Sequence, residues 1–202
     1  PVCTPTRASL LTGKHPARLG MTIWHEGALN QPKNLKLIPP ESQPNLPQGE
    51  VTLAEALREK GYHNAIVGKW HLGDAGHYPE AQGFDLVRGG TFWGAPPTYF
   101  APYRGLFSGR ELRYVPGLWP AREGEYLTDR LTAEACGAVD VLEGQKRPWM
   151  LYLAHHAPHT PIEAPAELVK KYERKLRPGM QHTNATYAAM VESFDASVGR
   201  VW

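Results

Sequence analysis

The feature that most constrains the fold is a pair of short apolar segments, each followed by a polar stretch that contains histidine. Residues 62–67 are predicted to form a buried strand that ends before Gly68-Lys69-Trp70-His71-Leu72-Gly73, and residues 149–154 a second strand that ends before residues 155–161. Helices are predicted before, between and after these strands. This alternation is typical of a layered α/β domain with a parallel sheet, in which ligands bind beyond the carboxyl ends of the strands.

The helices are predicted from caps and apolar spacing. Thr52 and Glu55 form a capping box, and Gly61 ends that helix. Another helix begins at Thr128, and a short one covers residues 166–175. The last begins near Thr183 or Asn184. The residues expected to face the core in the two longer helices are Leu131, Ala135, Val139 and Leu142, then Tyr187, Met190, Val191, Phe194 and Val198. Residues 21–48 are expected to be loop. Residues 77–119 are expected to form a long ordered loop with a functional role.

The first thirteen residues predict a helix that presents a cysteine. Pro5 is tolerated in a first helical turn because it has no N–H to satisfy, and Gly13 can end the helix in a left-handed conformation. Cys3 is then placed at the helix N-terminus, where free N–H groups and the dipole stabilise an anion. Arg7, one turn further along, can point back to the same place. A buried structural cysteine is the plainer alternative.

Lys69 and His71 are two residues apart just after a predicted strand. On extended backbone their side chains project to one side while Trp70 turns to the other, so a cation and an imidazole face one anion. A surface lysine and a hydrogen-bonded core histidine are the alternative reading. His155, His156 and His159 alone would suggest a transition-metal site. However, Glu163 is the only acidic residue or cysteine near them, and their spacing is not that of a helical zinc motif.

Together these strings resemble the formylglycine-dependent (type I) sulfatases, which are arylsulfatase-like members of the alkaline phosphatase superfamily. The resemblance rests on Cys3-x-Pro5-x-Arg7 with the following Leu-Leu-Thr-Gly, on Gly-Lys-Trp-His-Leu-Gly at 68–73, and on residues 78–85 and 190–200. Thr6 departs from the serine usual in the family. The resemblance implies an αβα sandwich with a mostly parallel sheet, of which residues 1–202 would be a partial catalytic domain, incomplete at both ends and internal to a longer protein.

The resemblance also implies a reaction. A sulfuric ester hydrolase of this family cleaves a sulfated carbohydrate or an aryl sulfate through a formylglycine hydrate made from cysteine, here Cys3, and passes through a covalent sulfo-enzyme. Lys69 would bind the sulfate and the formylglycine, and His71 would act as the base. His159 would bind the sulfate and protonate the leaving oxygen, and Arg7 would complete the catalytic set. His155 and His156 are expected to be structural or supporting residues.

Further implications concern cofactors and partners. The family uses a divalent cation, usually Ca²⁺, and position 3, as formylglycine, is its only family ligand within residues 1–202. Asp74 and Asp85 are near the Lys69 loop but fall in no family metal motif. These residues alone are therefore expected to be inactive. The expected partners are a small-molecule or glycan sulfate ester and a formylglycine-generating enzyme, in a periplasmic, secreted or lysosomal setting.

Composition excludes other classes. The net charge is +2 and the basic residues are dispersed, so no nucleic-acid surface is expected, and no segment reads as a membrane span. Two cysteines, Cys3 and Cys136, do not make a disulfide framework. Two rivals to the sulfatase hypothesis stay open at this point. One is a phosphodiesterase or phosphonate hydrolase of the same superfamily, and the other is a non-catalytic remnant.

Overall fold

The computed structural model describes residues 2–30 and 34–202. Residues 31–33, in the middle of the expected loop, and Pro1 lie outside the described residues. The chain divides into two compact units. The first comprises Pro1–Gly94 and Ala138–Ala154, and the second comprises Ala95–Gly137 and His155–Trp202. Each unit is described by itself.

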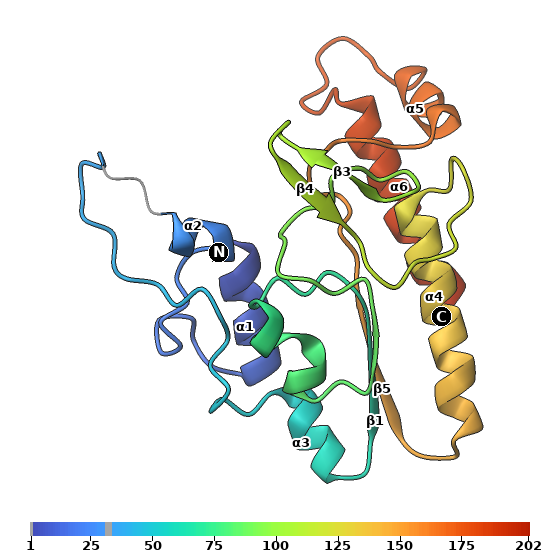
Figure 1. Cartoon of the computed structure of the whole chain (residues 1–202). Coiled ribbons are helices and arrows are strands. Elements are labelled where there is room, and N and C mark those ends of the chain that lie inside the picture. Colours follow the sequence, from blue (N-terminus) through green and yellow to red (C-terminus); the bar gives the residue numbers. More distant parts are fainter. Residues whose placement is uncertain (1, 31–33) are drawn as a thin grey trace. The chain divides into compact units, whose positions relative to one another are not determined.

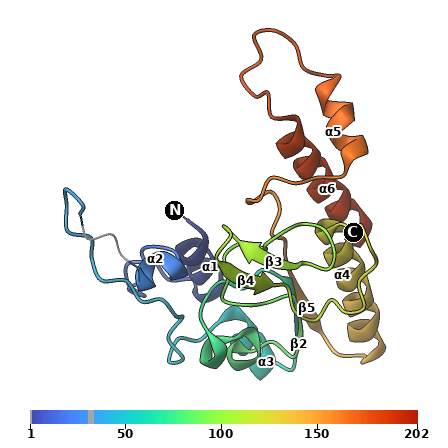
Figure 2. The same cartoon turned by 45° about the horizontal axis from the view of Figure 1, so that its top comes forward.

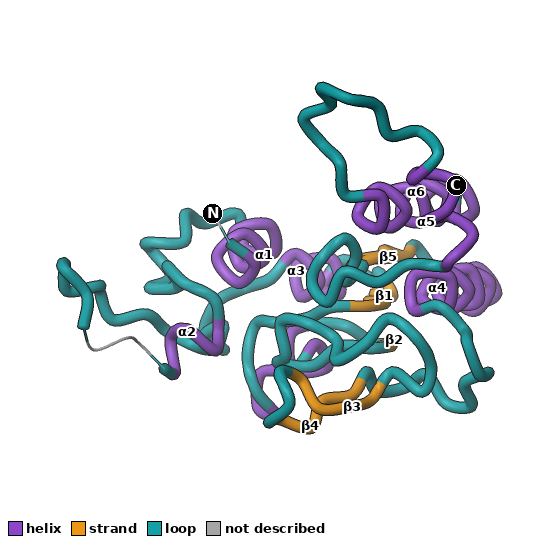
Figure 3. Tube along the Cα trace, turned by 90° about the horizontal axis from the view of Figure 1, so that it is seen from above, coloured by secondary structure: helices purple, strands orange, loops and turns teal. Residues whose placement is uncertain are grey.

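The first unit contains a parallel sheet, which confirms the predicted fold class. Strand β1 (His63–Gly68) lies between β2 (Leu86–Arg88) and β5 (Trp149–Ala154), as Figure 3 shows, and it pairs in parallel with both. β1 is buried from its second residue onward, because it pairs on both edges. β2 falls within residues 77–119, where no element was predicted, and three residues are too short to carry an alternating pattern.

The helices of the first unit follow their local signals where those signals are strong. Helix α1 (Cys3–Thr12) ends at Gly13, whose φ of 68° is left-handed, as predicted. Helix α3 (Leu53–Glu59) has the predicted capping box, and it packs against α1 and β1 (Figure 1). Helix α2 (His25–Leu29) corrects the prediction that residues 21–48 are loop. Its five residues make little more than one turn, so no apolar periodicity could reveal it.

Between β1 and β2 the chain forms two 3₁₀ turns, η1 (Ala75–His77) and η2 (Pro79–Gln82). The core of this unit is assembled from α1, α3, β1 and the segments that follow them. Its fully buried side chains are Ala8, Met21, Leu46, Ala54, Ile66, Trp70 and Leu72.

The second unit holds the antiparallel hairpin of β3 (Arg104–Phe107) and β4 (Glu111–Tyr114), which the sequence did not predict. It also holds the first part of α4 (Leu127–Gly144), whose residues from Ala138 onward belong to the first unit. Helices α5 (Ala166–Glu173) and α6 (Ala185–Val201) pack side by side (Figure 2). No helix within the described residues is long and apolar enough to cross a membrane.

The predicted core faces of the long helices are confirmed in part. In α4, Leu131, Ala135 and Leu142 are buried and Val139 is half-buried. Of the five residues predicted to face the core in α6, only Met190 is buried. The prediction is wrong for the other four members of that stripe, which are 39–50% exposed, namely Tyr187, Val191, Phe194 and Val198.

Candidate active site

Cys3 is the first residue of α1. The residue before it, Val2, has extended backbone and makes no side-chain cap, so the first N–H groups of the helix have no capping side chain. The Cys3 side chain is half-buried and lies close enough to the side chain of Lys69 to raise the pKa of that lysine, against the effect of burial. A thiol thus lies where the positive end of a ten-residue helix and a lysine ammonium meet.

Lys69 follows β1 directly and is only 3% exposed. Its backbone N–H donates to the carbonyl of Ala154 at 2.6 Å, which continues the pairing of β1 with β5. Burial and then the nearby charge of Arg7 lower the pKa of Lys69, whereas Cys3 and Glu26 act in the opposite direction. Two cations held together in a poorly solvated place repel each other, and a bound anion would relieve that repulsion.

The guanidinium of Arg7 is fixed in place by hydrogen bonds. Its Nη1 donates to the carbonyl oxygen of Lys69 at 2.6 Å and lies 3.3 Å from the hydroxyl of Tyr152 on β5. Burial lowers the pKa of Arg7, and its interactions with Tyr152 and Cys3 act in the opposite direction. The guanidinium therefore links α1 to the end of β1 and fixes the positive charge beside Cys3.

His71 is 2% exposed and has a left-handed backbone, with φ of 61°. The prediction of extended backbone through this loop is therefore wrong at His71. Its N–H donates to the carbonyl of Thr91 at 2.9 Å, and its carbonyl accepts from the hydroxyl of Thr4 at 2.9 Å. Because Thr4 follows Cys3 in α1, this second bond ties His71 to the helix that carries the cysteine. Trp70, between Lys69 and His71, is fully buried in the core, as predicted.

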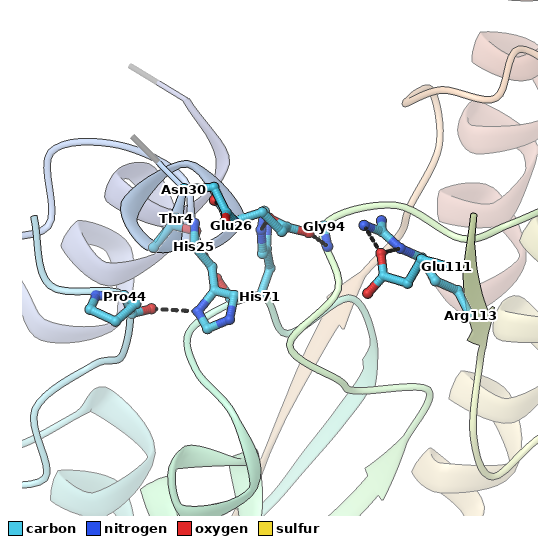
Figure 4. A network of polar contacts seen from close by, with 9 residues as sticks. All are labelled: Thr4, His25, Glu26, Asn30, Pro44, His71, Gly94, Glu111 and Arg113. Atoms are coloured by element: carbon cyan, nitrogen blue, oxygen red, sulfur yellow. Dashed lines mark hydrogen bonds and ion pairs between the residues drawn. The ribbon is translucent and has the colours of Figure 1, made fainter. Parts of the chain in front are cut away.

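Glu26 is a site residue that the sequence did not predict. It lies in the first turn of α2, and its Oε2 is 2.7 Å from Nε2 of His71, while its Oε1 accepts from the N–H of Gly94 at 3.0 Å (Figure 4). Burial alone would raise the pKa of Glu26, but the hydrogen bond and charge of His71 and the Gly94 N–H lower it to about 2. Glu26 is therefore ionised at neutral pH.

The structure thus gathers Cys3, Arg7, Lys69 and His71 within the first unit. His159, the remaining predicted residue, belongs to the second unit and is half-buried there. Its N–H donates to the carbonyl of His156 at 3.0 Å, and its Nδ1 lies 3.0 Å from the carbonyl oxygen of Thr160. One bond therefore holds the backbone of His159 and the other orients its imidazole.

A network around Glu163 supports the His159 segment. The hydroxyl of Tyr99 donates to the carbonyl of His159 at 2.9 Å, while the N–H of Tyr99 donates to the Glu163 carboxylate at 2.7 Å. Thr98 donates to the same carboxylate at 2.8 Å, and Tyr126 donates to the Glu163 carbonyl at 2.9 Å. The sequence predicts no role for these residues. Thr98 and Tyr99 lie within residues 77–119, which show no periodicity, and Tyr126 and Glu163 belong to no motif.

His155 and His156 are both buried. Nε2 of His155 lies 2.7 Å from the hydroxyl of Ser197 on α6, and that hydroxyl also accepts from Thr132 on α4 at 2.6 Å. Burial lowers the pKa of His155 to about 4, so its imidazole is neutral at physiological pH. These contacts support the expectation that His155 has a structural role.

Across residues 2–30 and 34–202, no group of three or more His, Cys, Asp or Glu side chains could hold a metal ion. The two carboxylates near the Lys69 loop have protein partners. Asp74 lies 3.3 Å from Nδ1 of His77, and Asp85 accepts from the N–H of Asn64 at 2.8 Å. The described residues therefore contain no complete set of acidic side chains for a calcium ion.

Known proteins resemble the chain over almost its whole length. A family model described as Sulfatase matches residues 1–202. The chain is 32% identical to the uncharacterized sulfatase YdeN of Escherichia coli (strain K12), over 99% of this chain and 35% of that protein. It is 30% identical to mouse (Mus musculus) N-acetylgalactosamine-6-sulfatase, over 100% of this chain and 37% of that protein.

Among solved structures, the crystal structure of Ps i-CgsB in complex with k-i-k-neocarrahexaose matches with a TM-score of 0.69 and 28% identity. The match covers 98% of this chain and 43% of that one. The chain therefore spans a little over a third of the length of the curated relatives named here and less than half of this structural relative.

Proposed function

The chain belongs to the sulfatase family, and we propose that the protein hydrolyses sulfate monoesters, with a sulfated carbohydrate as the favoured substrate and an aryl sulfate as the alternative. The observation that carries the proposal is the position of Cys3, at the start of α1 and close enough to the buried Lys69 to influence the pKa of that lysine. Carbohydrate is favoured because one similar protein is named for an acetylgalactosamine sulfate and another was crystallised with a neocarrahexaose.

The cations near Cys3 have a direct use in this reaction. A sulfate monoester is an anion, and negative charge on its ester oxygen grows as the S–O bond breaks. Lys69, which is buried, and Arg7, which is half-buried, provide two positive charges, and the N-terminus of α1 provides N–H groups. We propose that Lys69 contacts the sulfate directly, while Arg7 holds the Lys69 loop against α1 and adds its charge.

The residues around Cys3 fit the formylglycine that the family forms at this position. Formylglycine, when present, supplies a hydrated aldehyde as the nucleophile. The side chain of Lys69 lies near position 3, since Cys3 raises the pKa of Lys69 against the effect of burial. In addition, Nδ1 of His71 is buried without a hydrogen-bond partner among the described residues. We propose that this nitrogen accepts a proton from a hydroxyl group at position 3. We also propose that His159 protonates the leaving oxygen of the substrate.

A calcium ion, if the protein uses one, needs ligands beyond those found here. Ca²⁺ takes about six to eight oxygens, and the described residues contain no cluster of three acidic or metal-binding side chains. No step in this proposal depends on the metal. We propose instead that residues 1–202, as a partial catalytic domain, supply the nucleophile, the cations and the histidines.

The test uses the full gene product co-expressed with a formylglycine-generating enzyme. Mass spectrometry of the peptide that contains Cys3 should show the aldehyde. The protein should release inorganic sulfate from sulfated oligosaccharides or from 4-nitrophenyl sulfate, and Cys3→Ala should not. An unmodified thiol together with no sulfate release would contradict the proposal. Preferential turnover of phosphate diesters or phosphonates by the modified protein would favour the rival hydrolase.

A further inference from the structure

Glu26 makes two hydrogen bonds with residues far away in the sequence. One carboxylate oxygen is 2.7 Å from Nε2 of His71, and the other accepts from the N–H of Gly94 at 3.0 Å. The carboxylate thereby joins α2, the loop after β1 and the loop that contains Gly94 (Figure 4). Its side chain is 28% exposed, whereas that of His71 is 2% exposed. The imidazole is therefore the enclosed partner, and Glu26 contacts it at one nitrogen only.

The imidazole of His71 has little freedom to turn. Gly94 lies against the ring, and a Cβ added there would be 2.3 Å from Cε1 and 2.7 Å from Nε2. The backbone of His71 is held by Thr91 on one side and by Thr4 on the other. With the ring confined in this way, the identity of the atom that faces each nitrogen determines where the proton resides.

A carboxylate without a proton can only accept a hydrogen bond, and the charge state of Glu26 at neutral pH is set by its low pKa. Nε2 of His71 must then carry the hydrogen. In the neutral imidazole the other nitrogen, Nδ1, is left without a proton and can accept one. Nδ1 is buried and has no hydrogen-bond partner within the described part of the chain.

We propose that Glu26 is a positioning residue that fixes His71 in the Nε2–H tautomer, leaves Nδ1 as the proton acceptor, and stabilises the imidazolium once Nδ1 is protonated. The inference rests on the proposed function for the role of His71 in turnover. It goes beyond that function by assigning a chemical task to a residue outside the predicted catalytic set. A carboxylate that orients a catalytic histidine in this way has the same effect in the catalytic triad of serine proteases.

The test compares Glu26→Gln with the wild type. A glutamine has one oxygen and one NH₂ group, so it cannot accept from both Nε2–H of His71 and the Gly94 N–H. If its oxygen stays with Gly94, its NH₂ faces Nε2 and favours the opposite tautomer. We expect kcat for a sulfate ester to fall on the order of 10²- to 10⁴-fold. KM should change by only a few-fold, because Lys69 and Arg7 are unaltered.

A second readout does not require turnover. In protein labelled with ¹⁵N at histidine, the nitrogen chemical shifts of His71 report which nitrogen carries the proton. The wild type should show the Nε2–H tautomer and Glu26→Gln should shift toward Nδ1–H. Glu50→Gln, which alters a carboxylate paired with Lys14 in the same unit, is the matched control and should change neither measurement. Peptide mass spectrometry should show equal modification of Cys3 in each protein.

The outcomes separate the two proposals. A wild type that hydrolyses no sulfate ester would overturn the proposed function, while the tautomer measurement would still decide the inference about Glu26. An Nδ1–H tautomer in the wild type would overturn the inference. So would a Glu26→Gln variant with kcat within about twofold of the wild type and an unchanged tautomer. A loss of kcat with an unchanged tautomer would also count against it, because a general structural defect would then explain the loss.

Discussion

Acid sensitivity at His155 follows directly from its surroundings. Its imidazole is buried against the ring of Phe194, with centroids 5.5 Å apart, and Nε2 faces the hydroxyl of Ser197. Nδ1 is buried without a hydrogen-bond partner among the described residues. A protonated His155 would therefore carry a charge in a poorly solvated place and an N–H with no acceptor. Burial accordingly lowers the pKa of His155 from 6.5 to about 4.

The sign and size of the effect follow from proton linkage. Above about pH 6.5, His155 is neutral in both the folded and the unfolded protein and imposes no penalty. As the pH falls from 6.5 to about 4, the unfolded chain binds a proton that the folded protein does not, so the free energy of unfolding decreases. At about 1.4 kcal/mol per pKa unit, the loss approaches roughly 3 kcal/mol near pH 4.

Chemical denaturation of the wild type and of His155→Gln between about pH 4 and pH 8 measures this effect. Relative to the variant, the wild type should lose on the order of 3 kcal/mol of unfolding free energy toward pH 4. His182→Gln, which removes an exposed histidine, should keep the wild-type pH dependence. Parallel pH profiles of the wild type and His155→Gln would refute the reasoning, because they would mean that His155 titrates equally in both states.

Three further predictions concern the site. Alanine substitution of Lys69, His71 or His159 should lower kcat/KM for a sulfate ester on the order of 10²- to 10⁴-fold, and His155→Ala should cost less than His159→Ala, as steady-state assays can measure. Gly94→Ala should also lower kcat, because its Cβ would lie 2.3 Å from the ring of His71, whereas Gly76→Ala, with open space around it, should not. A polypeptide of residues 1–202 should show no tight calcium binding by calorimetry and no sulfate release, and tight binding with multiple turnovers would show a metal site that the described residues do not reveal.

The sequence predicts best those helices and strands that are specified by nearby residues, such as a cap, a terminal glycine or an apolar run. Thr52 and Glu55 bond each other's backbone as a capping box, and Gly13 adopts the left-handed conformation that ends α1. β1 and β5 are apolar runs, and they pair with each other over their full length. By contrast, β2 is a strand because it pairs with β1, and its own three residues carry no pattern. Short elements that depend on a partner cannot be predicted from local signals.

The exposed stripe on α6 illustrates a different limit. Val191 and Phe194 keep helical spacing, which correctly predicts a helix, yet both are more than a third exposed. Periodicity shows that a face is apolar, but it does not show which segment covers that face. The prediction of α6 as a helix was therefore correct, while the prediction of its buried residues was largely wrong.

Within the site, Cys3 and Lys69 could be related from sequence because Cys3 begins a helix and Lys69 directly follows a strand, and the family resemblance places both in one site. Glu26 could not, since it is 45 residues from His71 and lies on a five-residue helix. Gly94 gives no sequence signal either. Its role depends on the close approach of an imidazole, which appears only once the fold is formed. Contacts that support a catalytic side chain are therefore harder to predict than the side chain itself.

The left-handed backbone of His71 connects these supporting contacts to function. A non-glycine residue in this region is strained by about 1 to 2 kcal/mol and persists only where its surroundings hold it. Here the bonds to Thr91 and Thr4 hold the backbone, and Glu26 and Gly94 confine the ring. Each of these contacts offsets part of the strain while it orients the imidazole. Loss of one contact should therefore reduce the stability of the protein slightly, because the strained turn can relax, but reduce turnover strongly, because a relaxed turn no longer directs Nδ1.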